Sequence, residues 1–257
     1  MAYLRTHSFE HGPVEAVLFD KDGTLSNSEP MLEALAAARI TQCLRLAALT
    51  RREPSPPRQL MQLLQSAYGL TSAGIRPAGT TAVATRGHNL IATATAFTQV
   101  GFDWPDALEL SEQAFALTDH LHGQNGDHPP QPTEGLVALL ERLHACRVRC
   151  AVISNDHEAG IRSFLSNHGL DHFFQGLWSA EHQPAKPFPG AVLGLCEMIG
   201  VSPERCVLIG DANSDLRMAR SAGVAVALGY STGWRQPVAL DPCFPQLSHW
   251  EELMVEP

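Results

Sequence analysis

The sequence predicts an α/β protein in which a doubly wound, Rossmann-like parallel-sheet core carries an inserted all-helical cap domain. An apolar run at Val14–Phe19 is typical of a buried strand. Residues 29–132 then show apolar side chains at helical spacing only, whereas residues 133–257 alternate short apolar runs with amphipathic helical stretches. Such alternation gives a parallel sheet with helices on both faces. We therefore assign residues 1–28 and 133–257 to the α/β core and residues 29–132 to the helical cap.

The elements follow in order along the chain. The first strand, Val14–Phe19, leads directly into Asp20 and a Gly-Thr turn. In the inserted segment we expect helices near residues 29–47, 58–68, 88–100 and 105–122, with a Pro-rich break at residues 54–57 and a Gly/Pro/Asn linker at residues 123–132.

The core then continues with strands and helices in alternation. Strands are predicted at Val148–Ser154, Cys206–Ile209 and Val224–Leu228, and helices at Gly135–Ala145, Asp156–His168, Pro187–Ile199 and Ser214–Ala222. Asp156 is expected to cap its helix. Because parallel strands end at one edge of the sheet, a functional site is expected at that edge.

The composition of the chain argues against several classes of protein. The chain has 257 residues, 44% hydrophobic and 18% charged, which suits a folded core and excludes disorder. A net charge of −9 argues against a nucleic-acid partner. No run of 18 apolar residues and no secretory pattern is visible, and the six cysteines lack a CxxC pair. We therefore expect a cytoplasmic protein with reduced thiols and no membrane partner, either a monomer or a homodimer.

Polar residues gather where the predicted strands end. Asp20 and Asp22 follow the first strand, and Asp211 follows another. A carboxylate at a strand end can act as a nucleophile, and a second one two residues on can act as a general acid or base. Hard oxygen ligands favour Mg²⁺. Of the 18 basic residues only two are lysines, Lys21 and Lys186, which invites a chemical explanation for each.

These residues form a pattern that resembles a known family. The segment Asp20-Lys21-Asp22-Gly23-Thr24-Leu25 is similar to the first motif of the haloacid dehalogenase-like hydrolases. Three further segments resemble the family's other motifs in the same order, namely Ser154-Asn155, Lys186 and Gly210-Asp211-x-x-x-Asp215. The position of the insertion resembles the branch of phosphoglycolate-phosphatase-like enzymes and sugar phosphomutases.

The resemblance implies a role for each residue. Asp20 would be the nucleophile that forms an aspartyl phosphate, and Asp22 the acid and then the base. Ser154 and Lys186 would complete the catalytic group. The metal set would be Asp20, Asp22 through its backbone carbonyl, Asp211 and Asp215, of which Asp215 is expected to bond Lys186 or a metal-bound water. Substrate contacts are expected from Gly23, Thr24 and Asn155 of the motifs. Arg76 and Arg86 of the cap are expected to contact the substrate as well, on grounds that do not depend on the resemblance.

Three assignments concern residues near the motifs or in the cap. Lys21 is expected to point away from the nucleophile, in a surface or cap-contact role. Arg76 and Arg86 flank the Gly/Thr-rich segment Pro77–Thr85, which we interpret as a loop reaching over the site. His120, His122 and His128 cluster near Asp127, and we interpret this segment as solvated in preference to a metal site.

The leading hypothesis is a Mg²⁺-dependent phosphatase that hydrolyses a small phosphorylated metabolite, a phosphomonoester, through an aspartyl-phosphate intermediate. A sugar phosphomutase of the same fold shares all four motifs and remains an alternative, as does a non-catalytic binding module. Dehalogenation is disfavoured because it needs no second acid, and Asp22 is present.

Overall fold

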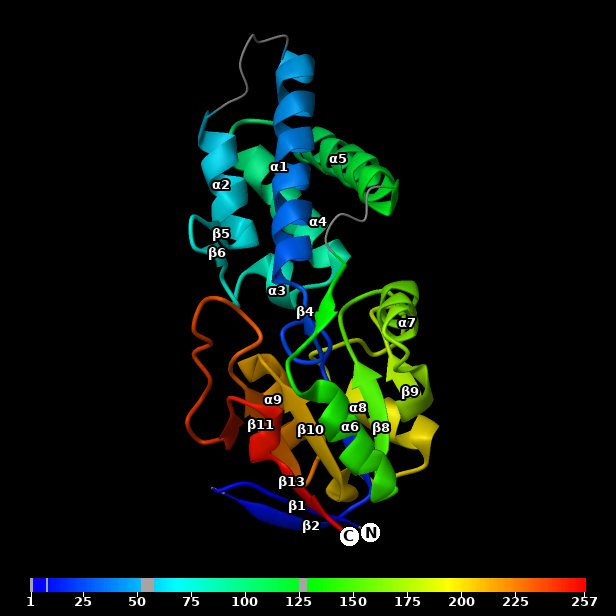
Figure 1. Cartoon of the computed structure of the whole chain (residues 1–257). Helices are drawn as coiled ribbons and strands as arrows, with labels where there is room; N and C mark the ends of the chain where they lie inside the picture. The colour runs from blue at the N-terminus through cyan, green and yellow to red at the C-terminus, as the bar shows by residue number, and fades with distance from the viewer. Residues whose placement is uncertain (1, 8, 52–57, 125–128) are drawn as a thin grey trace. The chain divides into compact units, whose positions relative to one another are not determined.

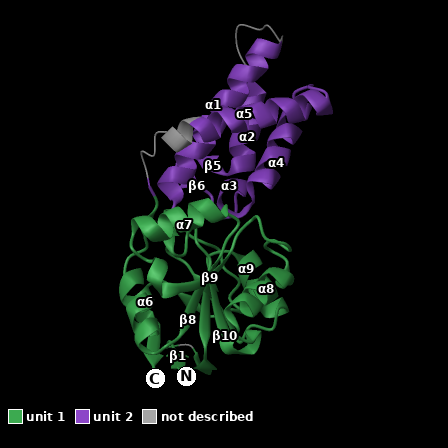
Figure 2. Ribbon diagram, turned by 90° about the vertical axis from the view of Figure 1, so that its right-hand side faces the viewer, with its two compact units in different colours: residues 1–27, 130–257 green, residues 28–129 purple. Residues whose placement is uncertain are grey.

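The computed structural model describes residues 2–7, 9–51, 58–124 and 129–257. For residues 51 and 121–124 it describes the backbone alone. The chain divides into two compact units (Figure 2). Unit 1 comprises residues 1–27 and 130–257, and unit 2 comprises residues 28–129.

Unit 1 is built on a six-stranded parallel sheet with the strand order β12-β11-β10-β3-β8-β9 (Figure 1). The strands are β3 (Ala16–Phe19), β8 (Arg149–Ile153), β9 (Phe174–Trp178), β10 (Cys206–Gly210), β11 (Val226–Tyr230) and β12 (Gln246–Leu247). The predicted α/β class is confirmed. The edge strands β9 and β12 were not predicted, because β9 has a mixed burial pattern and β12 has only two residues.

Helices cover both faces of this sheet (Figure 2). Val17 and Phe19 of β3 pack in one core cluster with α6 (Leu136–Ala145) and α7 (Glu158–Asn167). Ala16 and Leu18 point to the opposite face and pack with α8 (Pro189–Ile199) and α9 (Asn213–Ser221). Successive side chains of a strand alternate between faces, so an entirely apolar strand requires cover on both sides.

A second, antiparallel sheet joins the two chain ends in the order β13-β1-β2, from β1 (Ala2–Arg5), β2 (Glu10–Val14) and β13 (Met254–Glu256) (Figure 1). The single strand predicted over Val14–Phe19 is therefore wrong at its start. β2 ends at Val14 and β3 begins at Ala16, and the N–H of Glu15 between them donates to the backbone carbonyl of Arg205 at 2.9 Å.

Unit 2 is mainly helical. Its helices are α1 (Glu29–Arg51), α2 (Arg58–Tyr68), α3 (Thr80–Val83), α4 (Arg86–Gln99) and α5 (Trp104–Gln124). The prediction of an all-helical insertion misses a two-stranded antiparallel pair, β5 (Leu70–Thr71) with β6 (Gly74–Ile75). This pair is held to α1 by the Ile75 N–H, which donates to Glu29 Oε1 at 3.0 Å.

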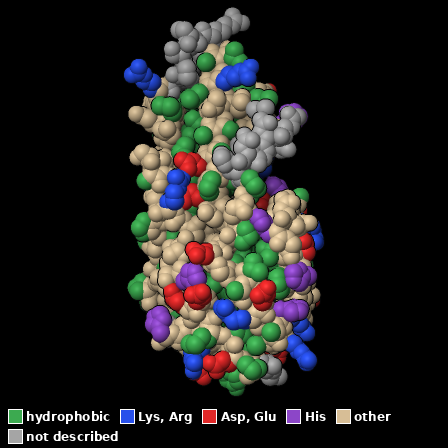
Figure 3. Space-filling view, in the orientation of Figure 1, with side chains coloured by type: hydrophobic (Ala, Val, Ile, Leu, Met, Phe, Trp, Pro, Cys, Tyr) green, Lys and Arg blue, Asp and Glu red, His purple; other side chains and the backbone are tan. Residues whose placement is uncertain are grey.

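The chain leaves and re-enters unit 1 through two short paired strands, β4 (Ser26–Asn27) and β7 (Gln131–Pro132). On the face drawn in Figure 3, basic side chains lie apart from one another and are not gathered into a single patch. Within the described part of the chain, none of the helices combines the length and apolar character that crossing a membrane requires.

Candidate active site

Three buried carboxylates meet at the carboxyl edge of the parallel sheet. Asp20 follows β3 and Asp211 follows its neighbour β10, so parallel pairing brings the two strand ends together. Asp215 lies in the first turn of α9. One carboxylate oxygen from each of Asp20, Asp211 and Asp215 lies within 4.8 Å of the others. Three residues separate Asp211 from Asp215, and the turn from β10 to α9 brings the two carboxylates close together.

Lys186 lies against this cluster. Its ammonium group donates to Asp20 Oδ1 at 2.5 Å and to Asp215 Oδ1 at 2.9 Å, and also to the backbone carbonyl of Ile153 at 3.3 Å. The side chain is buried. The lysine therefore links the end of β8 to the strand-end carboxylate of β3 and to α9.

Burial and charge shift the ionisation of the cluster. Burial raises the pKa of Asp20 to about 6, with Lys186 opposing the shift and Asp215 adding to it. Burial also raises the pKa of Asp211 well above its ordinary value, and the charges of Asp20 and Asp215 add to the rise. Burial alone would lower the pKa of Lys186, but the two adjacent carboxylates more than offset that effect and the net pKa lies above its ordinary value.

The donor set suits a hard divalent cation. Three carboxylates share one ammonium, so the fully ionised cluster carries excess negative charge in a buried place. Carboxylate oxygens are the ligands that Mg²⁺ prefers. Among the described residues this is the one group of three or more His, Cys, Asp or Glu side chains placed to share a metal ion. Of the histidine cluster, the His122 side chain, Asp127 and His128 lie outside the described residues.

The turn after β3 approaches the cluster closely. Gly23 has a φ of +81°, and a Cβ at this position would lie 2.2 Å from Trp234 Nε1 and 2.7 Å from Asp211 Oδ2. Only glycine adopts this conformation without strain and leaves room for both neighbours. Thr24 Oγ1 donates to Asp211 Oδ1 at 3.4 Å. Gly23 and Thr24 therefore shape the site beside Asp211.

Trp234 is a site residue that the sequence reasoning missed. Its indole N–H donates to Asp211 Oδ2 at 2.5 Å and the side chain is buried. The residue comes from the long segment between β11 and β12, outside all four motifs. Gly233, next to it, packs so closely on Gly23 that a Cβ would lie 1.8 Å from the Gly23 carbonyl oxygen. A Trp preceded by Gly after the last long strand is the only signal in the sequence, and alone it is not specific.

Asp22 and Lys21 lie on the same turn. The Asp22 side chain is 17% exposed, and its Oδ1 accepts from Lys21 Nζ at 2.6 Å and from Ser26 Oγ at 3.5 Å. Lys21 is 2% exposed and forms a second ion pair with Asp156 Oδ2 at 2.9 Å. The expectation of a surface role for Lys21 is wrong. The turn buries its stem, and two carboxylates compensate the buried charge.

The segment after β8 carries Ser154, Asn155 and Asp156. Ser154 is buried, and its Oγ accepts from the Asp156 N–H at 3.1 Å. Asn155 is half-buried beside it. The prediction that Asp156 caps the next helix is wrong, because His157 is the N-cap residue of α7. The Asp156 carboxylate instead bonds Lys21 and the His157 N–H.

Arg76 and Arg86 belong to unit 2 and have partners there. Arg86 forms an ion pair with Asp119 Oδ2 at 2.6 Å, and its guanidinium lies over the Phe115 ring. Arg76 Nη2 donates to the Ser66 carbonyl at 2.8 Å. The expected loop at Pro77–Thr85 contains the short helix α3.

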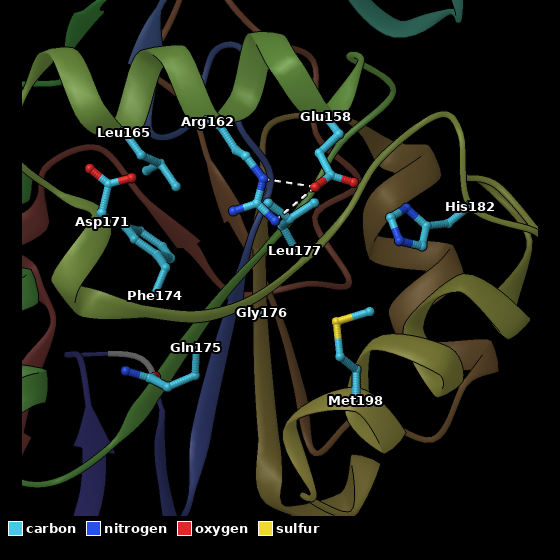
Figure 4. A pocket seen from close by; sticks show the side chains of 10 residues that line it. All are labelled: Glu158, Arg162, Leu165, Asp171, Phe174, Gln175, Gly176, Leu177, His182 and Met198. Carbon is cyan, nitrogen blue, oxygen red and sulfur yellow. Dashed lines mark hydrogen bonds and ion pairs between the residues drawn. The ribbon is translucent and has the colours of Figure 1, made fainter.

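A separate hollow of about 290 Å³ lies beside the edge strand β9, between α7 and α8 (Figure 4). The ion pair of Glu158 with Arg162 lines one side of it, and Asp171, His182 and Met198 line others. None of the residues predicted from the motifs lines this hollow. The acidic cluster at the sheet edge is therefore the stronger candidate for catalysis.

A buried carboxylate cluster with a shared lysine, at the carboxyl edge of a doubly wound sheet, suits the chemistry of phosphoryl transfer. The family model of the haloacid dehalogenase-like hydrolases matches residues 14–223. The chain therefore belongs to this family, which confirms the resemblance drawn from the motifs.

Similar proteins define the branch. The chain is 30% identical over 243 residues to a phosphoglycolate phosphatase of Thiobacillus denitrificans, covering 92% of this chain and 93% of that protein. A phosphoglycolate phosphatase of Pseudomonas syringae pv. tomato is 33% identical over 107 residues, which are 41% of this chain and 39% of that protein. The chain is thus a phosphatase, a hydrolase of phosphoric monoesters, in the phosphoglycolate-phosphatase-like branch.

Solved structures share the fold. A predicted phosphoglycolate phosphatase from Haemophilus somnus aligns with a TM-score of 0.62 at 21% identity, covering 91% of this chain and 93% of that chain. CbbY of Rhodobacter sphaeroides, in complex with xylulose-(1,5)-bisphosphate, aligns with a TM-score of 0.53 at 17% identity, covering 93% and 95%.

Proposed function

We propose that the protein is a Mg²⁺-dependent phosphatase that hydrolyses a small phosphomonoester in two steps through an aspartyl phosphate on Asp20. The observation that carries the proposal is the contact of one ammonium group, on Lys186, with both Asp20 and Asp215 beside Asp211. This arrangement prepares a carboxylate for attack on an anionic group.

In the first step a carboxylate oxygen of Asp20 attacks phosphorus and the bond from phosphorus to the ester oxygen breaks. Attack brings two anions together, and the ammonium of Lys186 reduces their repulsion while it holds the Asp20 carboxylate in place. Ser154, buried at the end of the adjacent strand, is proposed to donate its hydroxyl to the phosphate. Asn155, Gly23 and Thr24 are proposed to contact the substrate around it.

Asp22 is the proposed proton carrier. It would give a proton to the leaving alkoxide in the first step and take one from water in the second, when water attacks the aspartyl phosphate and releases phosphate. Its carboxylate is partly exposed and lies outside the buried trio of carboxylates. A proton carrier needs this access to the leaving group and to water.

Asp20, Asp211, Asp215 and the backbone carbonyl of Asp22 are the proposed Mg²⁺ ligands, with Asp215 also bonded to Lys186. When bound there, Mg²⁺ supplies positive charge that offsets the negative charge of the phosphate. Trp234 and Thr24 fix the Asp211 carboxylate by donating to its two oxygens.

Phosphoglycolate is the first substrate to test, because the relative that matches 92% of this chain is named a phosphoglycolate phosphatase. Helical unit 2 is proposed to act as a cap domain that selects the substrate, with Arg76 and Arg86 as donors to an anionic or hydroxylated leaving group. Arg86 would exchange its Asp119 partner for the substrate.

The test is a panel of small phosphomonoesters that includes 2-phosphoglycolate, with p-nitrophenyl phosphate as a generic ester. We expect steady phosphate release with Mg²⁺ and its loss in excess chelator, with recovery when Mg²⁺ is restored. Turnover that is insensitive to chelation would contradict the metal assignment. Turnover that requires a sugar bisphosphate activator would favour a phosphomutase.

A further inference from the structure

Both lysines of the chain are buried and each one bridges two carboxylates. Lys186 bonds the proposed nucleophile Asp20 and Asp215, and Lys21 bonds the proposed proton carrier Asp22 and Asp156. Lysine is almost never fully buried unless it is paired. Lys186 has a role in the proposed reaction, whereas the proposed reaction assigns no role to Lys21.

We propose that Lys21 is a positioning residue for Asp22, anchored by Asp156, and that it acts mainly on hydrolysis of the aspartyl phosphate. This inference rests on the proposed function, since it concerns the residue assigned there as the proton carrier. The ion pairs of Lys21 join it to Asp22 and Asp156 and not to the buried trio of carboxylates, so we infer that Lys21 acts through Asp22.

The geometry supports a clamp between two loops. Asp22 lies in the turn after β3, and Asp156 lies in the segment after the neighbouring strand β8. One ammonium group contacts both at 2.6 and 2.9 Å, so it ties the two loops together across the strand ends. Ser26 Oγ approaches the same Asp22 oxygen at 3.5 Å. These contacts hold the Asp22 carboxylate, the one half-buried side chain in a turn whose other residues, from Asp20 to Ser26, are buried.

Asp156 is held in turn by its own loop. Its Oδ1 accepts from the His157 N–H at 2.8 Å, and its N–H donates to Ser154 Oγ at 3.1 Å. A Cβ on Gly160 would lie 2.5 Å from Asp156 Oδ2, so the glycine leaves room for this carboxylate. The anchor of Lys21 is therefore fixed by the same segment that carries Ser154 of the proposed site.

Removal of Lys21 would leave Asp22 and Asp156 as two carboxylates around an uncharged space. Like charges repel, and the Asp156 carboxylate would still accept from the His157 N–H, so we expect the Asp22 carboxylate to be the one that moves. The consequence depends on the step. A p-nitrophenyl ester has a leaving group that departs without a proton, so its first step does not need Asp22, whereas activation of water in the second step does.

The test is stopped-flow turnover of p-nitrophenyl phosphate with Mg²⁺ by Lys21→Met, Asp22→Asn and Lys186→Met. For Asp22→Asn and Lys21→Met we expect a rapid burst of p-nitrophenolate near one equivalent per site, followed by steady turnover about 10²-fold below wild type. Acid quenching during the steady phase should recover phosphate bound to protein. Lys186→Met is the matched control and should show no burst, because it loses the first step.

The outcomes separate the two proposals. If Asp22→Asn shows a burst and Lys21→Met does not, the role of Lys21 is overturned and the two-step mechanism stands. If no variant accumulates bound phosphate, the two-step mechanism fails and the inference fails with it. Should Lys21→Met not fold, Asp156→Asn provides the second variant. Asp156→Asn removes the charge that pairs with Lys21, at a side chain that is 30% exposed. We expect it to release p-nitrophenolate in a burst smaller than that of Lys21→Met. Stopped-flow turnover by Asp156→Asn that matches wild type would contradict the proposal that Asp156 anchors Lys21.

Discussion

Lys186 Nζ lies 2.5 Å from Asp20 Oδ1, so the proposed nucleophile is ion-paired before any substrate is bound. The same nitrogen contacts Asp215 at 2.9 Å and the Ile153 carbonyl at 3.3 Å. Three acceptors surround one small ammonium group. A planar guanidinium is wider and fixes its donors in one plane, so it cannot reproduce these three directions in a buried space.

We expect Lys186→Arg to lose turnover on the order of 10²-fold, the usual effect of removing one positioned electrostatic group. The loss should fall on the first step and should be seen as a slower single-turnover release of p-nitrophenolate. Lys21→Arg is the comparison, because it changes the other buried lysine in the same way. Its single-turnover release should stay near wild type while its steady turnover falls. Identical profiles for the two variants would contradict separate roles.

The contrast between the lysines shows what the sequence could and could not predict. Their rarity beside 16 arginines pointed to both, and the motif placed Lys186. The burial of Lys21 was not predictable, because it depends on Asp156 from the loop after another strand. Local patterns report which residues end a strand, but they do not report which distant side chain returns to meet them.

Local sequence patterns also predict only part of the fold. The parallel strands and their helices have periodic apolar patterns, and their class was predicted correctly. The β5–β6 pair and the edge strand β12 each have strands of two residues, too short for any pattern. Trp234 reaches Asp211 from an irregular segment, where no periodicity indicates which side chain points inward.

Asp20→Asn tests the nucleophile. The carboxamide has nearly the shape of the carboxylate but does not attack phosphorus, so we expect no turnover above background while the circular dichroism spectrum stays that of wild type. Acid-quenched samples should contain no phosphate bound to protein. Substantial residual turnover by a preparation free of contaminating phosphatase would refute the covalent mechanism.

Arg86→Ala tests the role of the helical unit in specificity. Every residue of the acidic cluster lies in unit 1, whereas Arg86 lies in unit 2. We expect the variant to change the ranking of substrates in a phosphomonoester panel more than it changes hydrolysis of p-nitrophenyl phosphate.

The ion pair with Asp119 requires a control for that experiment. Asp119→Ala breaks the same pair but leaves the arginine, so a defect that comes only from the lost pair should be shared by both variants. Equal losses on all substrates in Arg86→Ala would indicate a folding defect and would count against a specificity role.

Asp211→Asn tests the metal cluster through stability as well as activity. Burial and the charges of Asp20 and Asp215 raise the pKa of Asp211 well above its ordinary value. A carboxyl whose pKa is raised on folding binds its proton more tightly in the folded state. Its favourable contribution to the free energy of unfolding is therefore complete below the unfolded pKa and is lost as pH rises through the folded pKa. Asp20, with a pKa raised to about 6, acts in the same direction.

Without Mg²⁺, the wild-type Tm should therefore fall as pH rises from about 4 through 6 and above, since ionisation of both groups is then opposed by the fold. Asn at position 211 keeps an oxygen that accepts from Trp234 and removes one buried negative charge. We expect Asp211→Asn to be more stable than wild type at pH 7 in chelator and to show a shallower dependence of Tm on pH.

Added Mg²⁺ should raise the Tm of wild type, because a ligand that binds only the folded state stabilises it, and should leave the Tm of Asp211→Asn almost unchanged. The variant should also lose turnover. An equal rise in Tm with Mg²⁺ in both proteins would exclude Asp211 as a ligand, and a variant less stable than wild type in chelator at pH 7 would show that its charge is compensated in the folded protein.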